Sequence, residues 1–102
     1  MRIIFAALIG IVVSFGSSAV LAADIAAGKA KTATCTACHG VSGISNNDLW
    51  PNLAGQKAGY LAKQIKAFRD GTRKDPLMAP MVAGFSDEDA ANVAAYFASL
   101  GN

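Results

Sequence analysis

The chain has 102 residues, which is enough for one small domain. Lys and Arg number 9 against 7 for Asp and Glu, and a charge so close to balance disfavours nucleic acid as a partner. Hydrophobic residues make up 53% of the chain. Many of them lie in one N-terminal segment, so this figure overstates the apolar content of the domain that follows.

A secretory signal peptide is predicted at the N-terminus. Arg2 precedes an uncharged apolar stretch over residues 3–13, and small residues lead up to Ala23. This order predicts cleavage after Ala22, or after Ala23 as the next choice. The alternative is an uncleaved anchor, since residues 3–23 are uncharged and long enough to span a bilayer. Their weakly apolar second half favours a signal peptide over residues 1–22, a domain over residues 23–102 and no membrane anchor.

The first predicted helix runs from about Asp24 to Thr34. Asp24 is a suitable N-cap residue, and Ile25 with several alanines forms a roughly helical apolar stripe. A loop is predicted from Gly40 to Gly55, because this stretch is rich in Gly, Asn, Ser and Pro.

Two further helices complete the prediction. One runs from about Lys57 to Phe68 or Arg69, and Gly71 is suited to the left-handed conformation that ends a helix. Its predicted buried face consists of Tyr60, Leu61, Gln64, Ile65 and Phe68. After a loop over residues 72–85, the last helix begins at Ser86, an N-cap residue followed by three acidic residues, and ends near Leu100. No strand pattern follows the signal peptide, so the predicted fold class is all-α.

Cys35-x-x-Cys38-His39 is the most informative motif, and it uses both cysteines and the single histidine of the chain. Haem carries two vinyl groups on adjacent pyrrole rings, and two thiols separated by two residues can bond both as thioethers. The next residue, His39, then supplies a neutral imidazole nitrogen to the iron. The motif therefore predicts one covalently bound haem c, a large apolar group that would also stabilise so small a domain.

Three other interpretations of the motif are weaker. A disulfide between Cys35 and Cys38 would close a very small loop and contribute little stabilisation. A thioredoxin-type dithiol is expected within a βαβ pattern, which the sequence lacks. A structural zinc needs four ligands, and beyond this motif only carboxylates remain to complete them.

The second axial ligand decides what such a haem does. An open position favours gas binding or peroxide chemistry, whereas a second strong ligand favours electron transfer. Met78 and Met81 are the two methionines after the signal peptide, and both lie in the predicted loop before the last helix. Methionine often fills gaps in cores, but two of them around Pro80 in a Pro- and Gly-containing loop favour an axial role for one.

From about Asp24 to Leu100 the sequence resembles the class I c-type cytochromes with one haem. It is similar to one half of the two-domain, di-haem periplasmic cytochromes c, although this chain has one such domain. The resemblance rests on an ordered set of motifs: Gly28, Cys35-Thr36-Ala37-Cys38-His39-Gly40, Pro51-Asn52-Leu53-Ala54-Gly55-Gln56, Tyr60-Leu61-x-x-Gln64-Ile65, Met78, Ser86-Asp87-Glu88-Asp89 and Ala94-Ala95-Tyr96-Phe97.

The resemblance implies a small cytochrome c fold, with three main helices and loops wrapped around one haem. It implies that the ligand methionine lies eight residues before the serine that opens the last helix, which is Met78, with Met81 as the alternative. It also implies that the Pro51 carbonyl accepts a hydrogen bond from the ring of His39. Such an acceptor fixes the orientation of a ligating imidazole and raises its basicity.

Two further positions follow from the resemblance. Gly28 is expected where the first and last helices cross, with Tyr96 or Phe97 packed on it, because glycine permits close approach. Trp50 is expected beside the haem, where its indole N–H would need a partner such as a propionate.

The implied function is one-electron transfer in a bacterial periplasm, by a monomer that serves redox partner proteins and is not itself an enzyme. One alternative is a haem-bearing subunit of a multi-subunit periplasmic oxidoreductase, and another is a gas- or peroxide-reactive haem protein. Four basic residues recur on and just after the second predicted helix: Lys63, Lys66, Arg69 and Arg73. They form either a positive strip that steers the protein to an acidic partner or a solvated helix face.

Overall fold

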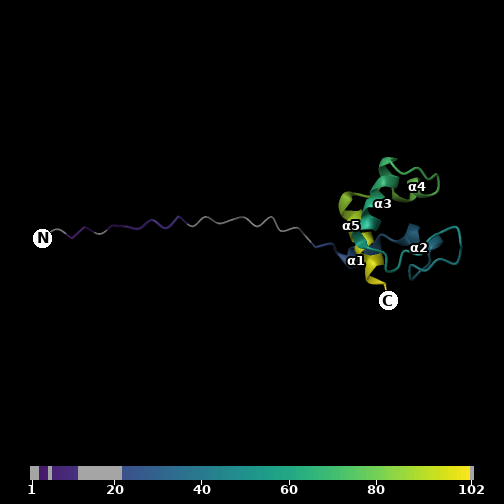
Figure 1. The fold of residues 1–102 in the computed structure, drawn as a ribbon, viewed down its shortest axis with the longest axis horizontal. Helices are drawn as coiled ribbons and strands as arrows, with labels where there is room; N and C mark the ends of the chain where they lie inside the picture. The colour runs from purple at the N-terminus through teal and green to yellow at the C-terminus, as the bar shows by residue number, and fades with distance from the viewer. Residues whose placement is uncertain (1–2, 5, 12–21, 102) are drawn as a thin grey trace.

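The computed structural model describes residues 3–4, 6–11 and 22–101 (Figure 1). This part of the chain contains helices and no strand, which confirms the predicted all-α class. The helices are α1 (Ile25–Ala30), α2 (Ala33–His39), α3 (Ala58–Asp70), α4 (Met78–Val82) and α5 (Asp87–Ser99).

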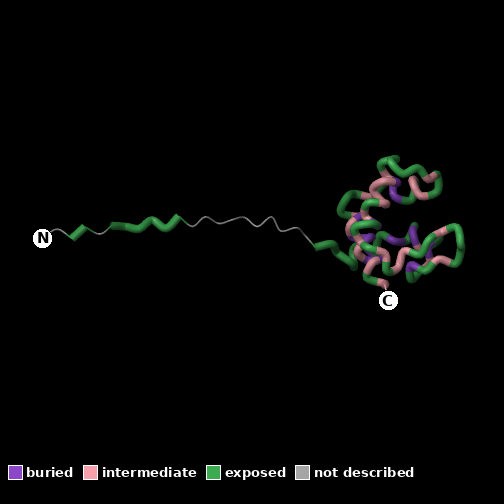
Figure 2. Tube along the Cα trace, viewed as in Figure 1, coloured by how far each residue is buried: buried purple, intermediate pink, exposed green. Residues whose placement is uncertain are grey.

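Most of the predicted signal peptide, residues 1–22, lies outside the described residues, so its cleavage stays a prediction. The residues of this segment that are described, 3–4, 6–11 and 22, are exposed and not helical (Figure 2). Within the described part of the chain, none of the helices is both long and apolar enough to cross a membrane.

The prediction of a single first helix from Asp24 to Thr34 is wrong, because the chain forms α1 and then α2. Asp24 does cap α1, since its carboxylate accepts a hydrogen bond from the Ala27 amide at 3.0 Å. The helix ends because the Lys31 amide donates to the Gly28 carbonyl and the Thr32 hydroxyl donates to the Lys29 carbonyl at 2.8 Å. The cysteine motif therefore lies on a helix of its own, which begins at Ala33.

The core lies between α3 and α5, close to where the sequence predicts it. Gly71 ends α3 in the left-handed conformation, with φ of 79°. Ser86 and Asp89 form a capping box at the start of α5, in which each side chain accepts from the other residue's amide at 3.0 Å. The buried cluster consists of Cys35, Leu61, Val93, Ala94, Tyr96 and Phe97.

α1 crosses α5 at Gly28, as expected. The nearest atoms to the place of a Gly28 side chain are the backbone atoms of Asn92 and Val93. The ring expected on Gly28 is not among these nearest atoms. The Phe97 ring lies close to Gly43 and lines the cavity described below.

α4 is a five-residue helix in a segment where the sequence predicts only loop. α4 packs against α3, and in Figure 1 it lies on the same side of the α3–α5 pair as α2. Arg69, near the end of α3, connects α3 to the start of α5. Its guanidinium donates to the Phe85 carbonyl at 3.2 Å and to the Asp87 carboxylate at 2.7 Å.

The four basic residues of the predicted strip do not form a row of equivalent charges. Arg69 is ion-paired with both Asp70 and Asp87. Arg73 lies over the ring of Phe68, with its guanidinium carbon 4.5 Å from the ring centre, and donates to the Gln64 side chain at 2.8 Å. The Arg69 side chain is only 19% exposed, so it is neither a fully solvated residue of a helix face nor a free charge of a positive strip.

Candidate functional site

A cavity of about 620 Å³ lies beside the core, and all helices except α1 contribute to its walls. Most of the side chains that line it are apolar: Leu49, Trp50, Leu53, Tyr60, Leu61, Ile65, Phe68, Leu77, Val82, Phe85, Val93 and Phe97. The polar lining is sparse. A cavity of this size with apolar walls and few polar groups suits a large organic cofactor.

The buried face predicted for the second helix is a wall of this cavity. Tyr60, Leu61, Gln64, Ile65 and Phe68 all line it from α3. Helical periodicity therefore identified the correct face, although much of that face borders the cavity and only Leu61 and Phe68 are buried.

Cys35 and Cys38 line the cavity from α2, three residues apart and therefore on one side of the helix. Cys35 is buried and Cys38 is exposed, and both thiols are free rather than joined as a disulfide. Burial raises the pKa of the Cys35 thiol, and a hydrogen bond with Thr34 opposes this effect in part.

His39 is the last residue of α2 and is buried at the cavity wall. Its Nδ1 lies 2.7 Å from the Pro51 carbonyl oxygen. A carbonyl can only accept, so Nδ1 carries the proton and donates it. In the neutral ring the lone pair is then on Nε2, which is the atom left to bind a metal.

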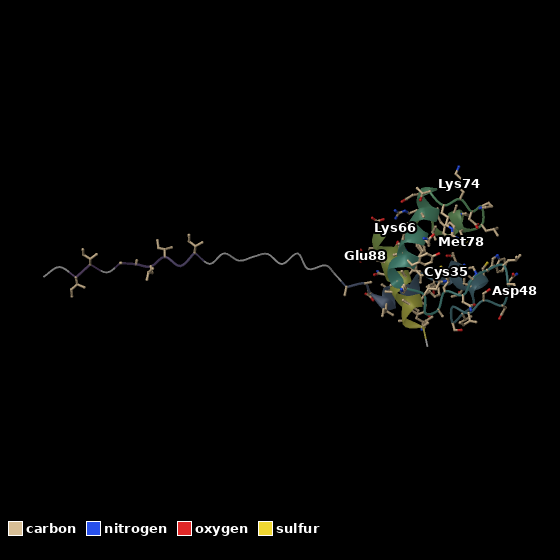
Figure 3. The ribbon with its side chains drawn as sticks, in the orientation of Figure 1. Cys35, Asp48, Lys66, Lys74, Met78 and Glu88 are labelled. Carbon is tan, nitrogen blue, oxygen red and sulfur yellow. The ribbon has the colours of Figure 1, made fainter. Side chains whose placement is uncertain are left out.

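Met78 and Met81 both line the cavity from α4. Met78 is partly buried, whereas Met81 is 42% exposed and its carbonyl lies 3.5 Å from the Thr34 hydroxyl. Figure 3 labels Cys35 on α2 and Met78 on α4, which approach the same cavity from different helices.

Sequence reasoning missed two charged residues of the cavity, Arg73 and Asp75. The sequence predicts Arg73 on the surface, as part of either a positive strip or a solvated helix face. The Asp75 carboxylate accepts hydrogen bonds from the Met78 and Leu77 amides, and these bonds hold the pKa of Asp75 below its usual range. The pair Asp75-Pro76 is a recognisable signal for the start of a helix, but the surrounding Pro and Gly residues favoured a loop.

A second hollow of about 410 Å³ lies on the other side of Cys38 and Trp50, which line both spaces. Its remaining walls come from α2 and the loop after it: Thr36, Ala37, Gly40, Val41, Asn46 and Asn47. His39, Met78 and Met81 are not among the residues that line it. The larger cavity is therefore the candidate site.

The donor set of the larger cavity fits haem better than zinc. Two thiols, one imidazole and two thioethers line one apolar space, and thioether sulfur and imidazole are axial ligands of haem iron. Among the residues that the structure describes, no group of three or more His, Cys, Asp or Glu side chains is arranged to hold a metal ion by itself. A structural zinc would need four such ligands.

Comparison with known proteins decides between these interpretations. The pattern that defines the family "Cytochrome c" matches residues 25–101. The chain belongs to the cytochrome c family. It is 53% identical to cytochrome c-554(548) of Halomonas halodenitrificans, over 76% of this chain and 98% of that protein. As a member of this family, the protein transfers electrons and carries covalently bound haem c.

Other relatives of this cytochrome are longer. Cytochrome c4 of Pseudomonas aeruginosa is 49% identical over 76% of this chain and 39% of its own length. The thiosulfate dehydrogenase electron acceptor of Stutzerimonas stutzeri is 47% identical over 66% of this chain and 32% of its own length. The chain thus spans about two fifths or less of these two proteins, whereas it spans nearly all of cytochrome c-554(548).

Proposed function

We propose that Cys35 and Cys38 hold haem c as thioethers, and that His39 and Met78 are its two axial ligands. The observation that carries this proposal is that all four side chains line one apolar cavity. When bound, haem supplies a one-electron couple between Fe(III) and Fe(II). The protein's own contribution is to fix the ligands and to keep water away from the iron.

The hydrogen bond between His39 and Pro51 supports the role of the imidazole. Because Pro51 accepts the Nδ1 proton at 2.7 Å, Nε2 stays unprotonated and the ring keeps one orientation. The ring does not need to turn or lose a proton when the iron changes its charge. Pro51 therefore acts on the iron through His39, by orienting the ring and raising its basicity.

Met78 is a better candidate than Met81 for the second axial position. Its side chain is less exposed, and its amide is held by Asp75 at 3.0 Å. The partly exposed Met81 instead has a backbone contact with α2. A thioether ligand and burial both stabilise Fe(II), so this assignment favours a fairly high reduction potential.

The protein is proposed to act as a free, monomeric carrier in the periplasm, after removal of residues 1–22. Two properties support this: the N-terminal segment has the order of a signal peptide, and cytochrome c-554(548) is also a protein of one such domain in length. The partners are redox proteins that donate one electron and accept one electron.

The test is to produce the full chain in a bacterium that assembles c-type cytochromes and to isolate the mature protein. We expect one haem per chain that resists extraction by acidified acetone, a weak far-red band of methionine-ligated Fe(III), and an N-terminus at Ala23. A double Cys35→Ala/Cys38→Ala variant is the matched control and should lose covalent haem. A colourless mature protein with both thiols free or paired would contradict the proposal.

A second candidate function is to accept electrons from, or form part of, a periplasmic oxidoreductase. Two relatives bear the name thiosulfate dehydrogenase electron acceptor, from Stutzerimonas stutzeri and Thiomonas intermedia. Rapid-mixing experiments with a thiosulfate dehydrogenase and thiosulfate would test it. Fast, saturable reduction and co-purification would favour this function, whereas slow reduction linear in enzyme concentration would favour the free carrier.

A further inference from the structure

The turn that leads into α4 is capped by a single side chain, that of Asp75. Asp75 Oδ1 accepts hydrogen bonds from the Leu77 amide at 2.8 Å and from the Met78 amide at 3.0 Å, and the Asp75 carbonyl accepts from the Ala79 amide at 3.0 Å. Asp75 therefore caps the turn over residues 75–79 that leads into α4, and Pro76, which has no amide hydrogen to satisfy, suits the start of that turn. The backbone of Met78 is therefore bonded directly to the Asp75 side chain.

The length of α4 makes this cap important. α4 has five residues, and a helix so short is not stable by itself. Leu77, which directly precedes the helix, makes no side-chain cap. Asp75 is thus a side chain that holds the turn leading into α4, and Met78 is the residue at which that turn becomes helix.

The position of Asp75 in the cavity wall also links it to Met78. Asp75 and Met78 both line the cavity, and the hydrogen bond from the Met78 amide to the Asp75 carboxylate joins them directly. The remainder of the segment is held at its ends, where Arg69 binds the Phe85 carbonyl and Asp87. Between these ends, Asp75 makes the side-chain hydrogen bonds that reach Met78.

We propose that Asp75 is a positioning residue for Met78: its double cap on the Leu77 and Met78 amides sets where the thioether sulfur lies in the cavity. This inference rests on the proposed function, in which Met78 is an axial ligand. It predicts that loss of the cap lets Met78 leave the iron more often, so that an external ligand replaces it more easily.

The experiment uses the mature holoprotein and imidazole as a competing ligand of Fe(III). Imidazole binding is followed by loss of the far-red band, and the reduction potential and Tm are measured on the same samples. Asp75→Ala removes the acceptor. Asp75→Glu keeps the charge but moves the carboxylate away from the capping position, and Asp75→Asn keeps an acceptor oxygen in place without the charge.

Asp24→Ala is the matched control, because Asp24 caps α1 by a bond of 3.0 Å to the Ala27 amide and α1 carries no ligand. We expect Asp75→Ala and Asp75→Glu to bind imidazole on the order of fivefold more tightly than the wild type, as expected for the loss of one helix cap. Asp75→Asn should stay within about twofold of the wild type. Asp24→Ala should lower Tm but leave imidazole affinity and potential unchanged.

The outcomes separate this inference from the proposed function. A wild type without the far-red band, or a Met78→Ala variant that keeps it, would overturn the ligand assignment itself. The positioning role is overturned if Met78 is the ligand and Asp75→Ala binds imidazole like the wild type. It is also overturned if Asp75→Asn binds as tightly as Asp75→Ala while Asp75→Glu does not, since charge would then matter rather than the cap. Where Asp75→Ala gives too little holoprotein, Asp75→Glu decides the question.

Discussion

The backbone of Gly28 in α1 lies directly against the carbonyl of Asn92 in α5. A Cβ atom added at position 28 would overlap the oxygen and carbon of that carbonyl and come within 2.9 Å of the Val93 amide nitrogen. The side chain of Asn92 also accepts from the Asp24 amide at 2.8 Å, so the two helices are joined at the same place. This contact fixes α5, which in turn forms a wall of the cavity.

Gly28→Ala is therefore expected to destabilise the protein by about 3 kcal/mol, because both neighbours are backbone groups that cannot move aside. Gly59→Ala is the matched control on α3, where a Cβ would meet nothing within 4 Å. It should be neutral or stabilise the protein by about 0.5 kcal/mol, since alanine favours a helix over glycine. Denaturant unfolding of the holoproteins measures both, and equal stability of the two variants would contradict this account of the crossing.

Met78→Ala is expected to abolish the far-red band and lower the reduction potential, because the thioether ligand that stabilises Fe(II) is lost. Met81→Ala should keep the band and change the potential little, since Met81 is 42% exposed at the edge of the cavity. Absorption spectra and redox titration are the measurements. Loss of the band in Met81→Ala alone would show that the ligand assignment is wrong.

Single cysteine variants should leave one thioether each. Cys35→Ala and Cys38→Ala are both expected to give protein with haem still attached, but with an alkaline pyridine spectrum shifted toward that of haem with one unreacted vinyl group. Cys35→Ala should also be the less stable of the two, because Cys35 belongs to the buried cluster and Cys38 is exposed. Equal spectra for these variants and the wild type would contradict two thioether bonds.

Low pH should destabilise the N-terminus of α5, because it protonates the Asp89 carboxylate that caps this end. The pKa of its carboxyl is lowered mainly by the hydrogen bond from the Ser86 amide, with a smaller contribution from Lys31 at 3.5 Å. Because the folded pKa lies below the unfolded value of about 3.9, this stabilisation is fully present above pH 4 and is lost as the pH falls through the folded pKa. Asp89→Asn should show a smaller drop in Tm between pH 7 and pH 3 than the wild type, and an identical drop would contradict this role.

The sequence by itself determined the parts of the protein that depend on local patterns. The Cys35-x-x-Cys38-His39 spacing identified the cofactor, because two thioether bonds and an adjacent imidazole require only neighbouring residues. Ser86 and Gly71 marked helix ends correctly, since N-caps and left-handed C-caps are local backbone chemistry. Helical periodicity likewise identified the face of α3 that lines the cavity.

Only the tertiary structure decided how the segments between these patterns are arranged. The break after Ala30 depends on hydrogen bonds of Lys31 and Thr32 that compete with a continuous helix, and apolar periodicity does not report such competition. α4 is stabilised by the Asp75 cap and by packing on α3, so propensity alone could not predict it. The entry of Arg73 and Asp75 into the cavity wall likewise depends on the path of the chain after Gly71, where Arg73 folds back onto Gln64 and Phe68 of α3.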